Sequence, residues 1–443
     1  MIDVLYQDHL AILQQRAAHL LEQHQLDAVL IHSGSTKNYF LDDYAPVFKP
    51  NPHFVHWMPF LREQPECWLL IQPASKPILF IYSPDDFWHM TASEPSDFWN
   101  QLFDIHLYTD RAAQLKQFNI AGNVALIAEN PVELPQLSVK HNPEALMHAL
   151  HFQRAEKTPW EQHCIRQANR IAIKGHRFTQ QGFFDGLSEF ELHQGYLAAT
   201  AQLEKELPYS NIVGLNEHAA VLHYQHKDRT APEQHRALLV DAGAVCHGYV
   251  ADITRTVSQG HQDFDAILVA MDQAQQALTE SIKPGVSFLA LHQQMHQKLF
   301  SILSTAGIVK SDAGLDPSDK VAITRTFYPH GLGHLLGIQV HDIGGWQQNI
   351  KGSMSAPPEQ HPFLRLTRLL TEQMVVTIEP GLYFIPLLLE QLKSTPLARH
   401  INWPLVNELT PWGGIRIEDN VCVTATGAEN YTRDAFNDPI IAL

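Results

Sequence analysis

The apolar positions of the first third of the chain alternate between helical and strand periodicity. Residues 6–25 repeat apolar residues at helical spacing, which predicts an amphipathic helix whose buried face contains Leu10, Leu13, Ala17, Leu20 and Leu21. The stretches LDAVLIHSG, CWLLIQPASKPILFIYSP and NVALIAENP are apolar runs bounded by turn residues, and each predicts one or two strands. We therefore expect residues 1–155 to form a small α/β domain.

A second pattern begins near residue 156 with two clear signals for the start of a helix. Thr158 and Glu161 form a capping-box sequence around Pro159, which suits the first helical position. Ser188 and Glu191 repeat the capping box farther along. Several strand-like runs follow these helices. We expect residues 156–443 to form one α+β domain with helices around a largely antiparallel sheet.

Four acidic residues occur in or directly after strand-like runs, where acids are disfavoured: Asp241, Asp252, Glu379 and Glu418. In RALLVDAGAVCHGYVADITRTVS, a turn centred between residues 246 and 247 predicts that Asp241 and Asp252 are direct cross-strand neighbours, with Cβ atoms about 5 Å apart. Two carboxylates at that distance repel. A positive charge must lie between them, or one must be protonated.

The segment FYPHGLGHLLGIQVHDIG brings three histidines close together, namely His330, His334 and His341. His330 and His334 are four residues apart, but Pro329 and the neighbouring glycines make a regular helix unfavourable. The segment also lacks the glutamate of a helical HExxH zinc site. Spacing alone leaves open which of the three binds a metal and which only pack in a glycine-rich loop.

Carboxylate oxygens combined with an imidazole suit Mn²⁺, Co²⁺, Fe²⁺ or Zn²⁺. Two aspartates and two glutamates can hold two such ions about 3.5–4 Å apart, an arrangement that ionises a shared water near neutral pH and polarises a carbonyl or phosphoryl oxygen. The strand acids and the histidine segment together indicate metal-assisted hydrolysis.

Composition narrows the class of protein further. A length of 443 residues predicts at least two domains, and no apolar run is long enough to span a membrane. Asp3 and Asp8 argue against a secretory signal, and four scattered cysteines are typical of a reduced, cytoplasmic protein. The net charge of −16 without a basic stripe argues against a nucleic-acid partner.

The order Asp241, Asp252, His334, Glu379, Glu418 resembles the ligand set of the two-metal pita-bread peptidases, which include methionine aminopeptidase, aminopeptidase P and prolidase. The resemblance to bacterial Xaa-Pro dipeptidases (prolidases) covers nearly the whole chain. It is carried by FLDDYAPVFKPNPHF, DDFWHM, PYSNIVGLNEHAAVLHY, LLVDAGAVCHGYVADITRT, PHGLGHLLGIQVHD, TIEPGLYF and GGIRIEDN. It implies a creatinase/aminopeptidase-like pita-bread fold for residues 156–443, with His334 as the metal-ligating histidine and His330 behind it.

The resemblance also implies roles for residues around the ions. His223 and His341 would face the substrate and stabilise the tetrahedral intermediate. Glu379 would be both ligand and proton shuttle, and Arg416 would tether ligands and substrate. Arg365 would bind the C-terminal carboxylate of a dipeptide, and Tyr209 would line the pocket.

Cofactors and partners follow from the same resemblance. It implies two divalent ions, usually Mn²⁺, and hydrolysis of dipeptides with C-terminal proline by a hydroxide held between them, with organophosphorus triesters as side substrates. It also implies a homodimer formed through the N-terminal domain, in which Trp88 and Asp42 help to close the partner's site.

Two departures from the usual prolidase pattern concern loops. Leu335 replaces the proline that usually follows the ligand histidine, and TEQM, residues 371–374, replaces QPGM. Both put loop geometry and substrate preference in question, while every ligand is retained.

Three alternatives remain open. Aminopeptidase P shares the ligands and acts on longer peptides. A creatinase-like enzyme has the fold without the metals, and a peptidase-fold binding module lacks catalysis. The complete set of five ligands argues against the last two.

Overall fold

The computed structural model describes residues 2–118, 120–134 and 137–440 and forms two compact units. The first unit contains residues Met1–Arg154, Thr158–Glu161 and Asn349–Gly352. The second contains Ala155–Lys157, Gln162–Gln348 and Ser353–Leu443. Among the described helices, none is long and apolar enough to cross a membrane.

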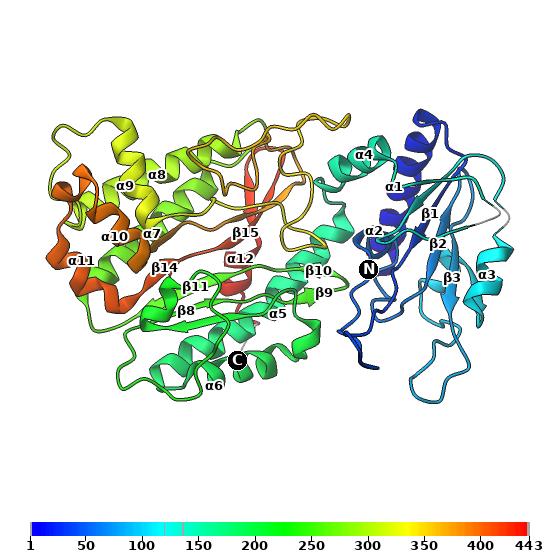
Figure 1. Ribbon diagram of the computed structural model, residues 1–443, viewed down its shortest axis with the longest axis horizontal. Helices are drawn as coiled ribbons and strands as arrows, with labels where there is room; N and C mark the ends of the chain where they lie inside the picture. The colour runs from blue at the N-terminus through cyan, green and yellow to red at the C-terminus, as the bar shows by residue number, and fades with distance from the viewer. Residues whose placement is uncertain (1, 119, 135–136, 441–443) are drawn as a thin grey trace. The chain divides into compact units, whose positions relative to one another are not determined.

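The N-terminal unit is a six-stranded mixed sheet with the strand order β4-β3-β2-β1-β5-β6 (Figure 1). Its helices are α1 (Ile2–Gln23), α2 (Pro52–Trp57), α3 (Arg111–Gln117) and α4 (Glu144–Arg154). Its strands are β1 (Ala28–His32), β2 (Trp68–Ile71), β3 (Ile78–Tyr82), β4 (Asp104–Tyr108), β5 (Val124–Ile127) and β6 (Val139–His141). The helix predicted over residues 6–25 and the strands predicted from the apolar runs are confirmed as α1, β1, β2, β3 and β5.

The two predicted capped helices are confirmed. The first begins with residues Thr158–Glu161 of the N-terminal unit and continues from Gln162 in the C-terminal unit. Thr158 and Glu161 bond reciprocally at the start of α5 (Pro159–Phe184), with the Thr158 amide 2.8 Å from Glu161 Oε2. Ser188 and Glu191 form the same box at the start of α6 (Glu189–Thr200). Each box satisfies helix amides that lack intrahelical partners, which is why the sequence signal located both helices.

Antiparallel strand pairs follow, with helices on both sides of them in Figure 1. The strands are β7 (Ile212–Leu215), β8 (Ala237–Asp241), β9 (Val245–Cys246), β10 (Tyr249–Val250), β11 (Thr254–Ser258), β12 (Val375–Ile378), β13 (Gly381–Tyr383), β14 (Gly414–Arg416), β15 (Asp419–Val423) and β16 (Ala428–Asn430). The remaining helices are α7 (Gln262–Glu280), α8 (Phe288–Thr305), α9 (Pro317–Phe327), α10 (Pro386–Lys393), α11 (Trp403–Leu409) and α12 (Tyr431–Asn437).

The predicted register of the first hairpin was wrong by two residues. Cys246 pairs with Tyr249, and farther along the hairpin Asp241 pairs with Thr254 rather than with Asp252. The turn lies on His247 and Gly248, whose φ angles are 46° and 85°. Two consecutive positive φ angles are typical of a tight type I′ turn, which shifts the pairing by one step on each strand.

Candidate metal centre

Strand ends place three of the four carboxylates in one row. Asp241 is the last residue of β8, and its ladder partner Thr254 begins β11. Thr254 also bridges to Glu418, directly before β15. Continuing the β12–β15 ladder by one step sets Glu379 opposite Glu418, because Ile378 pairs with Asp419. The row crosses four strands from Asp241 to Glu379.

Asp252 reaches this row from outside the ladder, and Tyr209 connects it to Asp241. The Tyr209 hydroxyl lies 2.7 Å from Asp241 Oδ1 and 2.6 Å from Asp252 Oδ1. One hydroxyl hydrogen can serve only one of these oxygens at a time. Asn420 holds the Asp252 backbone, accepting from its amide and donating to its carbonyl. The two aspartates therefore meet, as expected, although they are not ladder partners.

His334 completes the centre in a fixed tautomer. Its Nδ1 donates to the Leu335 carbonyl at 3.0 Å, which leaves Nε2 as the acceptor, 3.5 Å from both Asp252 Oδ2 and Glu379 Oε1. A lone pair facing two carboxylate oxygens is unfavourable unless a proton or a cation lies between them. Burial acts to lower the pKa of His334, but the two carboxylates override it and raise the pKa above its usual value.

The glycine-rich segment lets His334 approach β12 closely. A Cβ on Gly333 would lie 2.0 Å from the Thr377 carbonyl oxygen, so this position admits glycine alone without movement of the backbone. Thr377 in turn holds His334, because its Oγ1 accepts from the His334 amide at 3.1 Å. As predicted, the histidine segment does not form a helix; it follows α9 as a loop.

Arg416 holds the other side of the row. Its Nη2 donates to Asp241 Oδ2 at 2.7 Å, and its Nη1 donates to the Tyr383 hydroxyl at 2.9 Å. Its Nε donates to Thr254 Oγ1, and this hydroxyl donates to Glu418 Oε2. The guanidinium therefore positions two carboxylates, one directly and one through Thr254.

The centre carries more negative charge than the guanidinium balances. Burial raises the pKa of Glu379 to about 7 and raises the pKa values of Asp241 and Glu418 as well, with the neighbouring carboxylates adding to the effect. Asp252 is the exception, because its contact with His334 lowers its pKa despite burial. A bound divalent cation would reduce the repulsion among these crowded carboxylates and favour their ionised form.

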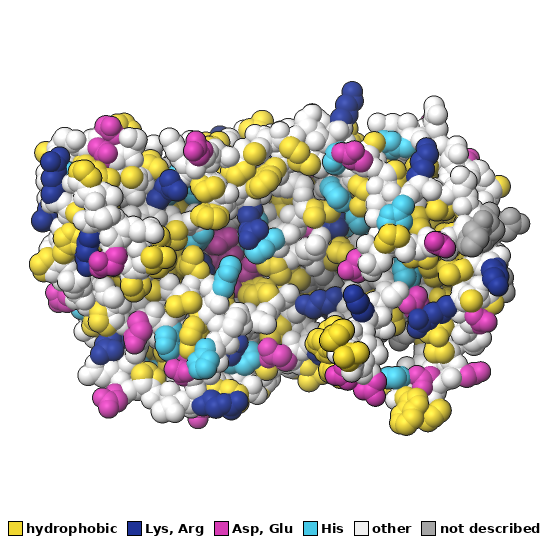
Figure 2. Space-filling view, in the orientation of Figure 1, with side chains coloured by type: hydrophobic (Ala, Val, Ile, Leu, Met, Phe, Trp, Pro, Cys, Tyr) yellow, Lys and Arg dark blue, Asp and Glu magenta, His cyan; other side chains and the backbone are white. Residues whose placement is uncertain are grey.

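The donor set fits divalent metal ions. Asp252, His334 and Glu418 each offer one ligand atom, and these atoms lie within 4.8 Å of one another. Asp241 and Glu379 adjoin them through the contacts described above. Acidic side chains gather in a hollow on the face shown in Figure 2, with histidines at its edge.

Three of the predicted substrate-facing residues are exposed in the same unit: His223, His341 and Arg365. The His341 ring is 4.5 Å from the His334 ring, at 87° to it. Although part of the His341 side chain reaches solvent, partial desolvation of its ring and then the charges of His334 and Arg365 lower its pKa to about 4. His341 is therefore a neutral imidazole at pH 7, able to donate a hydrogen bond.

The other predicted residues occupy different surroundings. His330 lies behind the centre, with Nε2 2.8 Å from the Tyr383 hydroxyl and Nδ1 3.7 Å from Glu379 Oε2. Trp88 belongs to the N-terminal unit, where its exposed ring packs against Phe87. Asp42 lies in the same unit and accepts from the Tyr44 amide.

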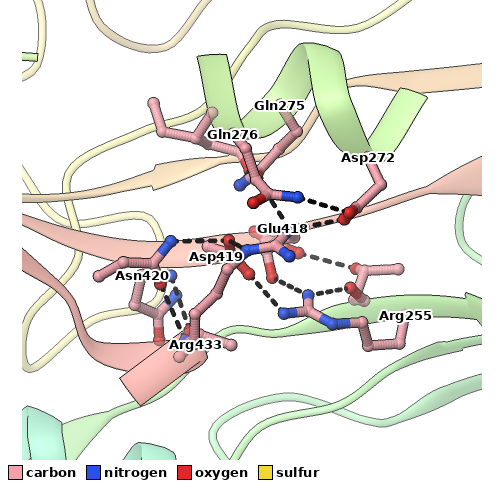
Figure 3. Close-up of polar contacts among 12 residues, drawn as sticks. Arg255, Asp272, Gln275, Gln276, Glu418, Asp419, Asn420 and Arg433 are labelled. Carbon is pink, nitrogen blue, oxygen red and sulfur yellow. Dashed lines mark hydrogen bonds and ion pairs between the residues drawn. The ribbon is translucent and has the colours of Figure 1, made fainter. Parts of the chain in front are cut away.

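Sequence reasoning missed a buried polar network behind Glu418. Asp419 accepts from Arg255 at 2.6 Å and from Arg433 at 2.7 Å (Figure 3). Arg255 also donates to the Glu418 carbonyl, so the network holds the backbone of this candidate ligand. The signal was present in IRIEDN, where a second acid and an asparagine follow Glu418 inside an apolar strand.

Comparison with known proteins agrees with this geometry. Residues 4–152 match the Xaa-Pro dipeptidase N-terminal domain, and residues 163–425 match metallopeptidase family M24. The chain is 46% identical to an Xaa-Pro dipeptidase of Pseudoalteromonas translucida, over 98% of this chain and 99% of the relative. It is 44% identical to an Xaa-Pro dipeptidase of Cronobacter sakazakii, over 98% of each chain.

Solved structures confirm the predicted fold. Zinc-substituted Escherichia coli aminopeptidase P has a TM-score of 0.71 at 22% identity, covering 96% of each chain. Proline aminopeptidase P II from Yersinia pestis has a TM-score of 0.70 at 22% identity, covering 99% of this chain and 98% of that one. With the family match over residues 163–425, they establish a pita-bread domain after the α/β domain. The chain belongs to metallopeptidase family M24 and carries the N-terminal domain of Xaa-Pro dipeptidases.

Proposed function

We propose that the chain is a metal-dependent Xaa-Pro dipeptidase that hydrolyses dipeptides with a C-terminal proline. The observation that carries this proposal is the convergence of Asp241, Asp252, His334, Glu379 and Glu418 in one unit of an M24 peptidase. Full-length similarity to Xaa-Pro dipeptidases supports the substrate class.

The five ligands would hold two divalent ions. Four carboxylates and one imidazole favour Mn²⁺, and Co²⁺, Fe²⁺ or Zn²⁺ are compatible with the same donors. When bound, the two ions supply Lewis acidity and an activated water near neutral pH. Arg416 and Tyr209 keep the carboxylates converged, since each contacts Asp241 and the Tyr209 hydroxyl also reaches Asp252.

Glu379 is suited to move a proton. Burial raises the pKa of Glu379 while no cation is bound, and a carboxylate beside the activated water can accept a proton and return it. Thr377 Oγ1 lies 3.4 Å from Glu379 Oε1. We assign Glu379 the transfer of the proton from the attacking water to the proline nitrogen that leaves.

His223, His341 and Arg365 would recognise the dipeptide. A neutral His341 would donate to the carbonyl oxygen of the residue before proline, together with His223, and stabilise the negative charge that develops there. The Arg365 guanidinium would bind the proline carboxylate in a bidentate manner. A cation at that position favours dipeptides over longer substrates, whose carboxylate lies farther away.

Tyr209 was predicted to line the substrate pocket. Its hydroxyl lies within hydrogen-bond distance of both aspartates, and we assign it the orientation of these carboxylates. A homodimer formed through the N-terminal domain, with Trp88 and Asp42 closing the partner's site, stays part of the proposal. The exposed Trp88 ring supports it.

The test compares hydrolysis of Leu-Pro and Leu-Pro-Pro by metal-stripped protein, with and without Mn²⁺. Cleavage of the dipeptide alone, and only with metal, is expected. Cleavage of the tripeptide would replace the proposal with aminopeptidase P activity. If neither peptide is cleaved although metal binds, the dipeptidase assignment fails, and a phosphotriester is the next substrate to assay.

A further inference from the structure

We propose that His292, His296 and His361 form a third metal site that binds one transition-metal ion of the zinc class. The three side chains are buried, and each offers a ring nitrogen within 4.8 Å of the others. None of them belongs to the carboxylate centre, and the proposal does not depend on the peptidase assignment. His292 and His296 come from α8, and His361 comes from the loop before β12.

The arrangement suits tetrahedral coordination. His292 and His296 are four residues apart, so they share one face of α8. The His292 ring lies 4.7 Å from the His296 ring and 4.4 Å from the His361 ring, nearly perpendicular to both. Ligand nitrogens around a tetrahedral zinc ion lie about 3.3 Å apart, given Zn–N bonds of about 2.0–2.1 Å. Small side-chain rotations would bring the three nitrogens to that spacing.

The tautomer of His296 is set by Thr324 on α9. The Thr324 hydroxyl donates to the Val321 carbonyl at 3.0 Å. The same oxygen therefore accepts from His296 Nδ1, 2.8 Å away. This leaves His296 Nε2 without a hydrogen and with its lone pair available. The distal ring nitrogen of a metal-ligating histidine usually donates to a carboxylate, a backbone carbonyl or a water, and here the Thr324 hydroxyl takes that place.

His292 carries a polar atom that lacks a partner in the described part of the chain. Its Nδ1 is buried without a hydrogen bond, and so is the hydroxyl of Tyr328. The Tyr328 ring lies 5.8 Å from His292 and 5.1 Å from His296. A buried nitrogen without a partner is unfavourable, and ligation of an ion would relieve it. The Tyr328 hydroxyl is available to a water that completes the coordination.

The three imidazoles are held in the form that binds metal. Burial lowers the pKa of His292 to about 2 and of His296 to about 3, and it lowers the pKa of His361 as well. Neutral rings need not lose a proton before binding an ion. Three nitrogens without a carboxylate favour Zn²⁺ or Co²⁺ over Mn²⁺, so the two centres would differ in metal preference.

In a second cluster of possible ligands, the carboxylate oxygens are already engaged in hydrogen bonds. Glu189, His218 and Asp228 also lie within ligand distance of one another. Glu189, however, already accepts from the Leu215 amide, the Tyr224 hydroxyl and the Asp228 amide. Its oxygens are engaged in holding the loop, so they are not free to bind a metal ion.

An ion at the trihistidine site would tie α8 to the loop that carries Arg365. The Leu364 amide donates to the His361 carbonyl at 3.1 Å, and Arg365 is the next residue. A Cβ on Gly331 would lie 3.0 Å from Leu364 Cα, so this loop also packs against the histidine segment of the metal centre. Binding at the trihistidine site would therefore order the loop that carries Arg365.

The experiment counts metal on the full chain after loading with Mn²⁺ and then Zn²⁺, followed by dialysis. Wild type is expected to retain about one ion more than His361→Gln. The exposed His226→Gln variant is the control and should match wild type. Loading with Co²⁺ should add an intense visible band, typical of tetrahedral coordination, that His361→Gln lacks. Equal metal content and equal spectra in wild type and His361→Gln would overturn the proposal.

Two further variants keep the result interpretable. Thr324→Val removes the hydroxyl behind His296 and preserves the side-chain shape, so Zn²⁺ affinity at this site should fall about 10–100-fold. Asp252→Asn should lose ions from the carboxylate centre and keep the tetrahedral Co²⁺ band. Loss of that band in Asp252→Asn, with the fold intact, would assign it to the carboxylate centre and contradict a third site.

Discussion

At the residue scale, groups outside the candidate metal centre fix its tautomers and charges. The Leu335 carbonyl sets the His334 ring with Nε2 toward the carboxylates. Because the acceptor is a backbone carbonyl, the replacement of the usual proline by Leu335 keeps this hydrogen bond and the position of His334. The Leu335 side chain is fully buried in the core of the C-terminal unit.

Asp252→Asn is expected to reduce kcat/KM for Leu-Pro by more than the ~10–100-fold typical of residues behind a metal ligand. The amide keeps the shape and the backbone contacts with Asn420 but removes the negative charge that a cation requires. Steady-state kinetics at saturating Mn²⁺ would measure the loss. Asp263→Asn, an exposed change in the first turn of α7, is the control. Wild-type activity in the Asp252 variant would remove this residue from the centre.

Arg365→Ala is expected to raise KM for Leu-Pro roughly tenfold or more, because a charge-assisted hydrogen bond contributes about 1.5–3 kcal/mol. Any residual tripeptide hydrolysis should change less, since its carboxylate lies elsewhere. Arg399→Ala, another exposed arginine of the same unit, should leave both KM values unchanged. An unaltered dipeptide KM in the Arg365 variant would refute the assigned role.

At the element scale, the second departure from the prolidase pattern is a strained turn before β12. The Met374 amide donates to the Thr371 carbonyl at 3.3 Å, and Gln373 has a φ of 69°. Glycine is the residue that adopts this conformation without steric cost, and prolidases usually have glycine here. The turn keeps its conformation because the Gln373 amide donates to the Val423 carbonyl at 2.8 Å.

Gln373→Gly should therefore stabilise the protein by about 0.5 kcal/mol, the relief of left-handed strain exceeding the added chain entropy. Urea unfolding monitored by circular dichroism would measure the change. Gln276→Gly, in the interior of α7, is the matched control and should destabilise by about 1 kcal/mol. A loss of stability in the Gln373 variant would show that the glutamine side chain contributes more than the strain costs.

At the scale of the whole molecule, each unit contains a histidine that is buried in its neutral form. Burial lowers the pKa of His9 to about 4 and of His176 to about 3. In the N-terminal unit, His9 lies between Thr158 Oγ1 and the His56 carbonyl, both 2.8 Å away. In the C-terminal unit, His176 Nε2 donates to the Ala242 carbonyl, and its buried Nδ1 has no hydrogen-bond partner among the residues that the structure describes.

Acid should therefore destabilise both units. Below about pH 6.5 the unfolded chain binds protons that the folded chain excludes, so stability falls as the pH drops toward the folded pKa values. Between pH 7 and 5 each of these histidines should cost about 2 kcal/mol. Denaturant unfolding across this pH range would measure the loss of stability. His176→Gln should reduce the pH dependence of the free energy of unfolding by the contribution of one histidine. His226→Gln, at an exposed histidine, is the control and should leave the pH dependence unchanged. An equal pH dependence in wild type and in both variants would contradict the prediction.

Metal should also govern the stability of the whole chain. Removing the ions leaves buried carboxylates without compensating charge, so Mn²⁺ at 100 times its Kd should add about 2.7 kcal/mol. Thermal unfolding with a chelator and then with Mn²⁺ would show a Tm that rises by several degrees. Asp252→Asn should abolish most of this rise. A Tm independent of Mn²⁺ would contradict a metal centre formed by these residues.

The sequence by itself determined the local elements and singled out the candidate metal ligands. Helix starts were readable because a capping box is a contact between residues three apart, as at Thr158 and Ser188. Glu379 and Glu418 could be recognised because acidic residues are disfavoured in apolar strands. Both signals involve residues close together in the sequence, so they can be recognised without a structure.

Only the tertiary structure decided how these residues meet. The turn at His247 and Gly248 pairs Asp241 with Thr254 and not with Asp252. The Tyr209 hydroxyl nevertheless lies close to both aspartates. The network of Asp419 with Arg255 and Arg433, and the convergence of His361 with two histidines of α8, join residues far apart in sequence. No local pattern encodes such contacts, because they arise where separately folded elements pack against one another.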